Sequence, residues 1–245
     1  MTTSWFAGWF DSPYYHRLYF KRDEQEAAGF INKLINHLEP KAGCYMLDMA
    51  CGKGRHAKQL ADKGFDVTGL DLSFNSIHEA QKYESDKLHF FQHDMRLPFW
   101  MNYFDFCFNF FTSLGYFRTR RENNNAVRTM AQSLKKDGTL VIDYLNVHYA
   151  EDHFVYRLDK EIDGVEFRIT KWMDKDFFYK KIEIEDNNAS ESHIFTEKVA
   201  KFSLDDFTDM LGFQNMQVKE VFGDYNLGNY HIRNAPRMII VAKHR

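Results

Sequence analysis

The sequence predicts an α/β protein with a doubly wound, mainly parallel seven-stranded sheet (a Rossmann-like arrangement) and an antiparallel β insertion. Two observations support this fold class. From Tyr45 onward, short apolar runs that end in a carboxylate alternate with segments of helical periodicity, which is the order that builds parallel βαβ units. After residue 146 the pattern changes to alternation of apolar and polar residues, which is typical of antiparallel strands.

An aromatic segment and a first helix open the chain. Asp23 is placed to cap this helix, and Pro40 follows its end. One apolar stripe runs between them and consists of Ala27, Phe30, Ile31, Leu34, Ile35 and Leu38. We therefore expect one domain over residues 1–245, in which residues 1–40 form an N-terminal lid and helix and residues 147–202 form the insertion.

Residues 47–56 (LDMACGKGRH) join an apolar strand to a glycine-rich turn. Gly52 and Gly54 remove side-chain bulk, so that backbone amides and a helix N-terminus can approach a ligand closely. The same glycines, with Asp71 further on, also match a loose dinucleotide fingerprint. Asp48 separates the two possibilities, because a carboxylate here would repel a pyrophosphate but attract the ammonium and sulfonium of S-adenosylmethionine. The charge pattern thus favours S-adenosylmethionine.

Two more acids follow at the ends of the next two expected strands. Residues 66–73 (DVTGLDLS) predict a strand that ends at Asp71, with Ser73 placed to cap the following helix. Asp71 can accept hydrogen bonds from both ribose hydroxyls. Residues 88–94 (LHFFQHD) predict a third strand, and Asp94 followed by Met95 suits an adenine, with a carboxylate for the exocyclic amine and a thioether against the ring.

The remaining elements complete the sheet and the insertion. A helix over 122–134 is expected to lead through Gly138 into a fifth strand over 139–144, and a helix from Ser203 precedes two last strands over 216–222 and 237–243. Between them the insertion predicts an antiparallel meander beside the main sheet, with reversals at Asp163-Gly164 and Asn187-Asn188. Its expected strands are 154–162, 165–173, 177–185 and 193–202.

These motifs together resemble the class I S-adenosylmethionine-dependent methyltransferases over about residues 41–146. Residues 104–117 (FDFCFNFFTSLGYF) resemble the fourth motif of a bacterial small-molecule subgroup, and they lack the Pro-Pro-aromatic turn of enzymes that methylate nucleobase amines. The resemblance implies a cofactor site at and beside the motifs. The site consists of Tyr15, Tyr19, Asp48, Ala50, Cys51, Gly52, Gly54, His56, Asp71, Leu72, Asp94, Met95, Asn109 and Phe110.

Tyr15 and Tyr19 enter this site because tyrosines before the first helix resemble the family's aromatic lid, where a ring near a sulfonium gains cation–π energy. Ordinary core packing is the alternative. Methyl transfer is an in-line displacement that needs alignment and exclusion of water. Tyr116 and His148, just past the fourth and fifth strands, are candidate catalytic residues, with packing or structural hydrogen bonding as the alternative.

Composition limits the possible partners. A net charge of −3 implies no general affinity for nucleic acid, and no apolar run is long enough to span a bilayer, so we expect a cytoplasmic protein. The histidines are scattered, the cysteines have no zinc spacing, and no metal is expected. The expected function is methyl transfer to oxygen or nitrogen of a small molecule, with a homodimer possible. A noncatalytic S-adenosylmethionine-binding protein and an NAD-dependent oxidoreductase are the alternatives.

Overall fold

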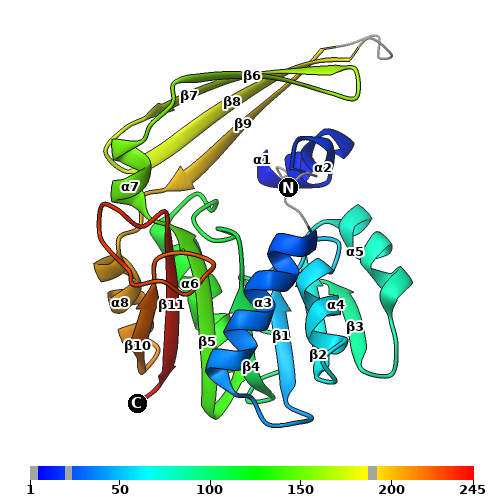
Figure 1. The fold of residues 1–245 in the computed structure, drawn as a ribbon, viewed down its shortest axis with the longest axis vertical. Coiled ribbons are helices and arrows are strands. Elements are labelled where there is room, and N and C mark those ends of the chain that lie inside the picture. The colour runs from blue at the N-terminus through cyan, green and yellow to red at the C-terminus, as the bar shows by residue number, and fades with distance from the viewer. Residues whose placement is uncertain (1–4, 20–23, 187–191) are drawn as a thin grey trace.

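The strands of the chain form two separate sheets, one mixed and one wholly antiparallel, in a computed structural model that describes residues 5–19, 24–186 and 192–245 (Figure 1). The seven-stranded sheet has the order β10-β11-β5-β4-β1-β2-β3, and β11 runs antiparallel to both of its neighbours while the other pairs are parallel. Its strands are β1 (Tyr45–Met49), β2 (Asp66–Asp71), β3 (Leu88–Gln92), β4 (Phe104–Asn109), β5 (Leu134–Leu145), β10 (Met216–Phe222) and β11 (Arg237–His244).

This arrangement confirms the predicted fold class. The strand order reverses between β1 and β4, and in sheets of this kind ligands bind outside the carboxyl ends of the strands at such a switch point. Asp48, Asp71 and Asn109 lie in or at the end of β1, β2 and β4. Parallel pairing brings these three ends to one edge of the sheet.

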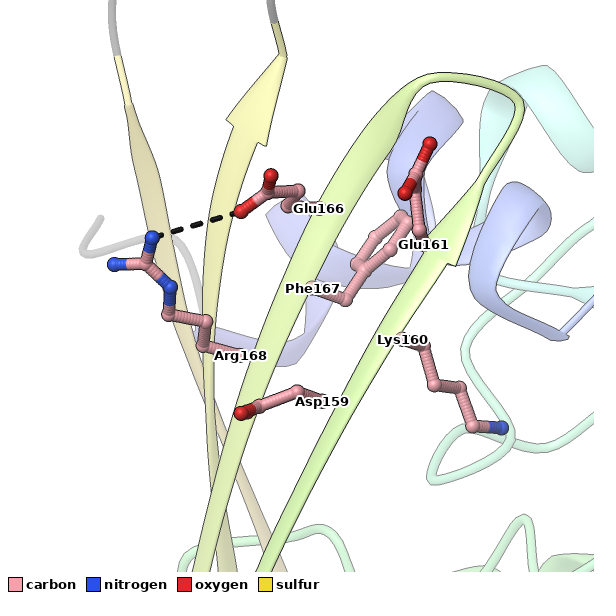
Figure 2. A pocket seen from close by; sticks show the side chains of 6 residues that line it. All are labelled: Asp159, Lys160, Glu161, Glu166, Phe167 and Arg168. Carbon is pink, nitrogen blue, oxygen red and sulfur yellow. Dashed lines mark ion pairs between the residues drawn. The ribbon is translucent and has the colours of Figure 1, made fainter.

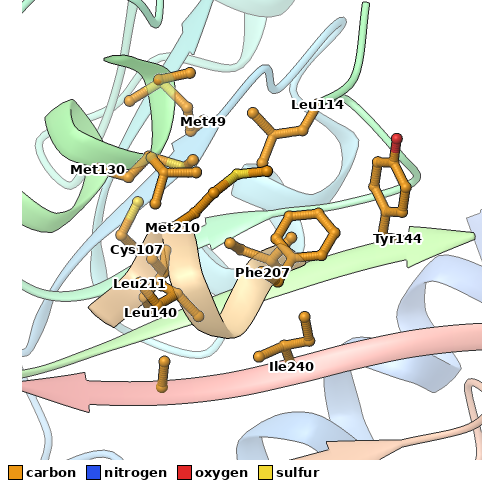
Figure 3. Packing of buried hydrophobic residues seen from close by; sticks show 14 of the residues in the cluster. Met49, Cys107, Leu114, Met130, Leu140, Tyr144, Phe207, Met210, Leu211 and Ile240 are labelled. Carbon is orange, nitrogen blue, oxygen red and sulfur yellow. The ribbon is translucent and has the colours of Figure 1, made fainter. Parts of the chain in front are cut away.

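Helices cover both faces of the large sheet. One face packs against α3 (Glu24–Leu38), α4 (Arg55–Ala61) and α5 (Phe74–Ala80), which is followed by the short helix η1 (Gln81–Tyr83). The other face packs against α6 (Arg120–Ser133) and α8 (Leu204–Gly212). Figure 3 shows Phe207 and Leu211 of α8 beside Ile240, and burying each such side chain stabilises the fold by roughly 1.5–3 kcal/mol.

Capping residues explain where the helices on this second face begin. Thr119 accepts a hydrogen bond from the Glu122 N–H, and the Glu122 carboxylate accepts one from the Thr119 N–H, so α6 starts at Arg120, slightly before the expected position. Ser203 and Asp206 form the same reciprocal pair at the start of α8, as the sequence predicted for a helix from Ser203. The cap expected at Asp23 of α3 falls outside the described residues.

The insertion forms its own four-stranded sheet, which we call the insertion sheet: β6 (Arg157–Ile162), β7 (Val165–Met173), β8 (Phe177–Asp186) and β9 (His193–Ala200). Asp163 (φ 49°) and Gly164 (φ 76°) make the expected two-residue turn. The reversal expected at residues 187–188 falls outside the described residues. The helix α7 (Val147–Asp152) connects β5 to this sheet.

The insertion sheet packs against the N-terminal helices α1 (Trp5–Phe10) and α2 (Pro13–Tyr19), whereas the sequence analysis expected it beside the main sheet (Figure 1). Alternate residues of β7 provide the reason. Val165, Phe167 and Ile169 are buried, and Trp9 and Leu18 of the N-terminal helices cover them. The aromatic amino terminus therefore supplies the apolar partner that one face of this sheet needs.

Candidate functional site

In the glycine-rich turn after β1, three alternate residues have a left-handed backbone conformation. Ala50 (φ 64°), Gly52 (φ 56°) and Gly54 (φ 78°) all have positive φ, and Gly54 is the N-cap of α4. A Cβ on Gly54 would lie 2.5 Å from the Phe90 ring, whereas a Cβ on Gly52 would meet no protein atom within 4 Å. Gly54 is therefore required by packing inside the protein, and Gly52 leaves space free at the surface of the turn.

Asp48 lies beneath this turn and is 1% exposed. Burial raises the pKa of its carboxyl group to about 7, although the backbone N–H of Ala57 in α4 acts to lower it. Its Oδ2 has no hydrogen-bond partner among the described residues. A buried oxygen that lacks a donor is costly, and a ligand ammonium would supply donors.

Asp71 links the turn to the next helix. Its Oδ2 accepts the Gly52 N–H at 2.8 Å, and its Oδ1 accepts the Ser73 N–H at 2.8 Å. Each carboxylate oxygen keeps a lone pair for a further donor, so Asp71 can still receive the two ribose hydroxyls. Burial raises the pKa of Asp71 above its ordinary value. The adjacent Leu72 presents its carbonyl oxygen to the Gln92 side chain at 3.0 Å.

An ion pair holds Asp94, the expected adenine acid. The Arg96 Nη2 donates to Asp94 Oδ2 at 2.6 Å, and the Arg96 Nη1 donates to Glu122 at 2.9 Å. Burial acts to raise the pKa of Asp94, but the hydrogen bonds and charge of Arg96 hold it below its ordinary value. The Met95 carbonyl oxygen accepts a hydrogen bond from Thr129, so the Asp94-Met95 pair is fixed from two sides.

The end of β4 adds buried polar groups to the same edge. Asn109 donates its side-chain N–H to the Met49 carbonyl oxygen at 2.9 Å, while its Oδ1 lacks a partner among the described residues. The His56 ring stacks on Phe111 with centroids 5.0 Å apart, and its Nε2 likewise lacks a described partner. Burial lowers the pKa of His56 to about 3, so this ring is neutral. Phe110 is buried beside it.

The orphaned atoms of Asp48, His56 and Asn109 thus belong to residues of β1, β4 and the first turn of α4, around the glycine turn. Unsatisfied buried polar atoms are rare, and several at one place indicate a polar ligand. The residues present fit S-adenosylmethionine, because they offer acceptors for an ammonium and for ribose hydroxyls and leave space at Gly52. Cys51 lies in this turn as a buried thiol whose pKa burial raises well above its ordinary value.

Aromatic rings of the N-terminal helices reach this edge. The ring centroids of Phe10 and Tyr116 are 5.1 Å apart, those of Phe10 and Tyr15 are 5.0 Å apart, and those of Tyr15 and Tyr19 are 4.9 Å apart. This chain of rings, Tyr116-Phe10-Tyr15-Tyr19, joins the loop after β4 to the N-terminal helices. The structure therefore brings together three of the tyrosines that the sequence analysis selected.

Asp11, which was not among the predicted site residues, joins the segment between α1 and α2 to the start of α5, where Ser73 also binds Asp71. Its Oδ1 accepts a hydrogen bond from the Ser73 hydroxyl at 2.6 Å and from the Asn75 N–H at 3.0 Å, at the start of α5.

His148, the second candidate catalytic residue, lies away from the chain of rings in the sequence. It lies on α7, and its Nδ1 is 3.6 Å from Glu151 of the same helix. Its catalytic role stays a prediction.

A surface groove lies on the β6–β7 hairpin and is lined by Asp159, Lys160, Glu161, Glu166, Phe167 and Arg168 (Figure 2). Arg168 pairs at 3.5 Å with Glu166, which lies two residues earlier on the same strand. Acidic and basic residues are both present in the lining of the groove, and none of its residues belongs to the sheet edge described above.

Over the described ranges, no cluster of three or more metal-ligating side chains occurs. No helix in the described part of the chain is long and apolar enough to cross a membrane.

Comparisons with known proteins agree on one chemistry. A family profile described as "Methyltransferase domain" matches residues 46–138. A putative methyltransferase of Geobacillus sp. strain WCH70 is 27% identical, and the match covers 99% of this chain and 100% of the relative. A dTDP-3-amino-3,4,6-trideoxy-alpha-D-glucopyranose N,N-dimethyltransferase of Streptomyces venezuelae is 33% identical over 50% of this chain and 51% of the relative.

A solved structure shares the fold over nearly the whole chain. It is an S-adenosylmethionine-dependent methyltransferase from Clostridium acetobutylicum, with a TM-score of 0.78 and 17% sequence identity. The alignment covers 94% of this chain and 96% of that one.

Proposed function

Because the chain is a class I S-adenosylmethionine-dependent methyltransferase, we propose that it methylates the amine nitrogen of a small polar molecule, of which an amino sugar is the leading example. The observation that carries the proposal is that α1, α2 and the insertion sheet lie over the carboxyl ends of the parallel strands (Figure 1), where Phe10 contacts Tyr116 and Asp11 binds Ser73. A lid made from two elements of the chain favours a small acceptor over a polymer. The similarity to an amino-sugar N,N-dimethyltransferase supports nitrogen as the acceptor atom.

The aromatic chain gives a physical reason for an amine. The faces of aromatic rings stabilise cations, and N-methylation produces an ammonium where O-methylation leaves a neutral ether. The Phe10 ring lies 5.1 Å from the Tyr116 ring and 5.0 Å from the Tyr15 ring, centroid to centroid. A cationic product is therefore better matched to this edge than a neutral one.

The bound cofactor supplies an electrophilic methyl carbon on a sulfonium. Asp71 would hold the ribose hydroxyls, the Asp94-Met95 pair would hold the adenine, and Asp48 and Asn109 would face the amino-acid end. Tyr116 would accept a hydrogen bond from the acceptor amine. This hydrogen bond would orient the lone pair of the amine nitrogen toward the methyl group. His148 would take up the proton that an ammonium acceptor must lose before it attacks. The rings of α1 and α2 would keep water away.

Calorimetry with S-adenosylhomocysteine tests the cofactor assignment, because this product is stable and shares the ribose and adenine. We expect binding by the wild type and a loss of at least tenfold in affinity in Asp71→Asn, since an amide offers one acceptor oxygen where the carboxylate offers two. Asp62→Asn is the matched control, because Asp62 pairs with Lys58 on the outside of α4. Absence of binding to folded wild-type protein would contradict the assignment.

Labelled methyl transfer tests the acceptor. The protein and labelled S-adenosylmethionine are incubated with paired acceptors that differ only in an amine or a hydroxyl at one carbon, such as amino sugars and their parent sugars. We expect label in the amines alone. Label in the hydroxyl members, or in neither set while a protein or nucleic acid fraction is labelled, would reject small-molecule N-methylation.

A further inference from the structure

The connection between β3 and β4 differs from the other parallel crossovers of the large sheet. Helices α4, α5 and α6 form the crossovers from β1 to β2, from β2 to β3 and from β4 to β5. Residues 93–103, which join β3 to β4, contain neither a helix nor a strand. Parallel strands are normally covered by helices on both faces of the sheet. We call residues 93–103 the crossover loop, because this segment takes the place of a helix.

Aromatic rings of the crossover loop lie over the face of β3 that is turned away from α5. Phe90 is buried in the cluster that includes α5, so the next residue of the strand, Phe91, points to the opposite face. The Phe91 ring lies 5.8 Å from both Phe99 and Trp100, centroid to centroid. The Trp100 ring in turn lies 5.0 Å from Tyr103. These four rings form one connected surface, which we call the aromatic patch.

Much of this surface is exposed to solvent. Phe91, Trp100 and Tyr103 are 40%, 44% and 38% exposed. Leu97 and Met101 of the same loop are 56% and 62% exposed. Because a large side chain has roughly 200 Å² of surface, these five residues together leave roughly 500 Å² of largely apolar surface in contact with water. That area is near the upper limit for a monomeric protein, and patches of this size are often binding sites.

Extension of the sheet by a peptide strand is blocked at this edge, although β3 is the last strand of the sheet. The Phe90 N–H donates to the Glu84 carboxylate at 2.9 Å. The Leu88 N–H and carbonyl exchange hydrogen bonds with the backbone of Ser85 at 3.2 and 3.1 Å. The chain itself thus occupies outward backbone groups that an added strand would need. A partner of the aromatic patch must therefore bind through side chains.

The charges around the patch give no preference for an acidic or a basic partner. Residues 97–103 (LPFWMNY) contain no charged residue. The charged residues that flank them in the chain are paired, Asp94 with Arg96 at 2.6 Å and Asp105 with Lys135 at 2.9 Å. A nucleic acid or a strongly charged peptide would meet no complementary charge here. An uncharged apolar partner fits, and interfaces between identical subunits are more apolar than those of transient complexes.

The insertion sheet also exposes apolar side chains, but they are divided between its two faces. Leu158 and Met173 share a face with the buried Ile169, which packs against α1 and α2. Trp172 and Ile194 lie on the other face. Each face of the insertion sheet therefore has fewer exposed apolar side chains in its strands than the aromatic patch and its loop have.

We propose that the aromatic patch binds a second copy of this chain, so that the two patches pack against each other across a twofold axis. A standard interface buries roughly 800 Å² on each partner, and the exposed residues of β3 and the crossover loop supply more than half of that area. A twofold axis suits a patch without net charge, because each patch meets an identical one. The contact would also restrain the crossover loop, which carries the Asp94-Met95 pair.

Sedimentation equilibrium of the full chain over a wide range of protein concentration tests the proposal. We expect the wild type to be a dimer. Trp100→Ser should raise the dissociation constant of the dimer by roughly a hundredfold or more, because a buried interface tryptophan is a typical hot spot and the dimer contains it twice. Trp172→Ser is the matched control, since Trp172 is 39% exposed and also stacks on an aromatic ring, that of Tyr179. This control should dimerise like the wild type.

A second variant keeps the test informative if Trp100→Ser does not fold. Met101 is 62% exposed, so Met101→Asp should fold, yet its carboxylate would be buried without a partner in the dimer. We expect this variant to be monomeric. Circular dichroism shows whether each variant is folded.

Three results would overturn the proposal. A wild type that is monomeric at all concentrations would show that a second copy does not bind the patch. Equal dissociation constants for wild type, Trp100→Ser and Met101→Asp would place the contact elsewhere on the molecule. A dimer that is lost in Trp172→Ser and kept in Trp100→Ser would assign the contact to the insertion sheet.

Discussion

Asp143 and Arg237 form a buried ion pair that joins β5 to β11 behind the cofactor edge. The Arg237 Nη2 lies 2.6 Å from Asp143 Oδ1, and the Asp143 side chain is 0% exposed. The same carboxylate accepts the Phe111 N–H at 2.8 Å and the Tyr225 hydroxyl at 3.1 Å. One buried acid thus holds the strained turn after β4, where Phe111 and Thr112 have φ values of 55° and 57°.

Replacing Arg237 should therefore destabilise the protein strongly. Arg237→Met leaves the Asp143 carboxylate buried without its cation, and breaking such a pair costs roughly 3–5 kcal/mol. The measurement is urea unfolding followed by circular dichroism. Arg233→Met is the control, because Arg233 pairs with Asp152 at the surface and its loss should hardly shift the midpoint. Similar midpoints for both variants would show that the buried pair does not hold the turn.

Ala50 offers the opposite change, a gain in stability. Its φ of 64° forces an L-residue into the left-handed region, which costs roughly 1–2 kcal/mol relative to glycine. Glycine also loses more backbone entropy on folding, by roughly 0.5–1 kcal/mol, so Ala50→Gly should gain a net of about 0.5 kcal/mol. A raised urea midpoint with an unchanged slope would confirm this. Ala61→Gly at the end of α4 should lower the midpoint, since there the backbone is helical.

Alanine at Gly54 should mainly reduce stability, whereas alanine at Gly52 should mainly reduce affinity for the cofactor product. Both pay the cost of positive φ, but the new Cβ on Gly54 would also press on the Phe90 ring at 2.5 Å. Gly54→Ala should therefore lower the unfolding midpoint more than Gly52→Ala does. Gly52→Ala should instead weaken S-adenosylhomocysteine binding more, because its Cβ projects into space that the protein leaves free. If the shift of the unfolding midpoint and the loss of affinity for S-adenosylhomocysteine stand in the same ratio in both variants, the two glycines do not have these separate roles.

Much of the fold was predictable because its signals are local. Ser73 accepts the Ser76 N–H and caps α5, and Asp163-Gly164 forms the hairpin, both as the residues indicated. Each depends only on the backbone preferences of neighbouring residues. The place of the insertion sheet was not predictable in this way, because its partner, the aromatic segment around Trp9 and Leu18, lies far away in the sequence.

The residues of the candidate site show the same difference between local signals and contacts with distant segments. Asp48, Asp71 and the glycines were found because strand ends and turns mark them in the sequence. Asp11 was missed, since a single acid in a loop carries no sign of the distant groups that it contacts. Asp143 did leave a signal, a charged residue within the apolar run LVIDYL, which indicates a buried pair but does not identify Arg237 as the partner.

Asp48 should make the stability of the ligand-free protein depend on pH. Its pKa is about 7 in the folded state, against about 3.9 in an unfolded chain. Below pH 4 both states hold the proton, and the group adds no penalty. As the pH rises toward 7 only the unfolded state releases the proton, so the free energy of unfolding falls by about 1.4 kcal/mol per pH unit, or roughly 4 kcal/mol in all.

Asp48→Asn cannot ionise, so its advantage over wild type in urea unfolding should grow from pH 4 to pH 7. Asp94→Asn provides a control of opposite sign. The pKa of Asp94 is lowered in the folded state, so its contribution is present above its unfolded pKa and is lost as the pH falls, and Asp94→Asn should be most destabilised near neutral pH. A constant difference between Asp48→Asn and wild type over this range would mean that burial does not hold the Asp48 carboxyl protonated.

An ammonium bound beside Asp48 should oppose the fall in stability with rising pH, because it favours the ionised carboxylate. We therefore expect saturating S-adenosylhomocysteine to flatten the pH dependence of the wild type and to leave that of Asp48→Asn unchanged.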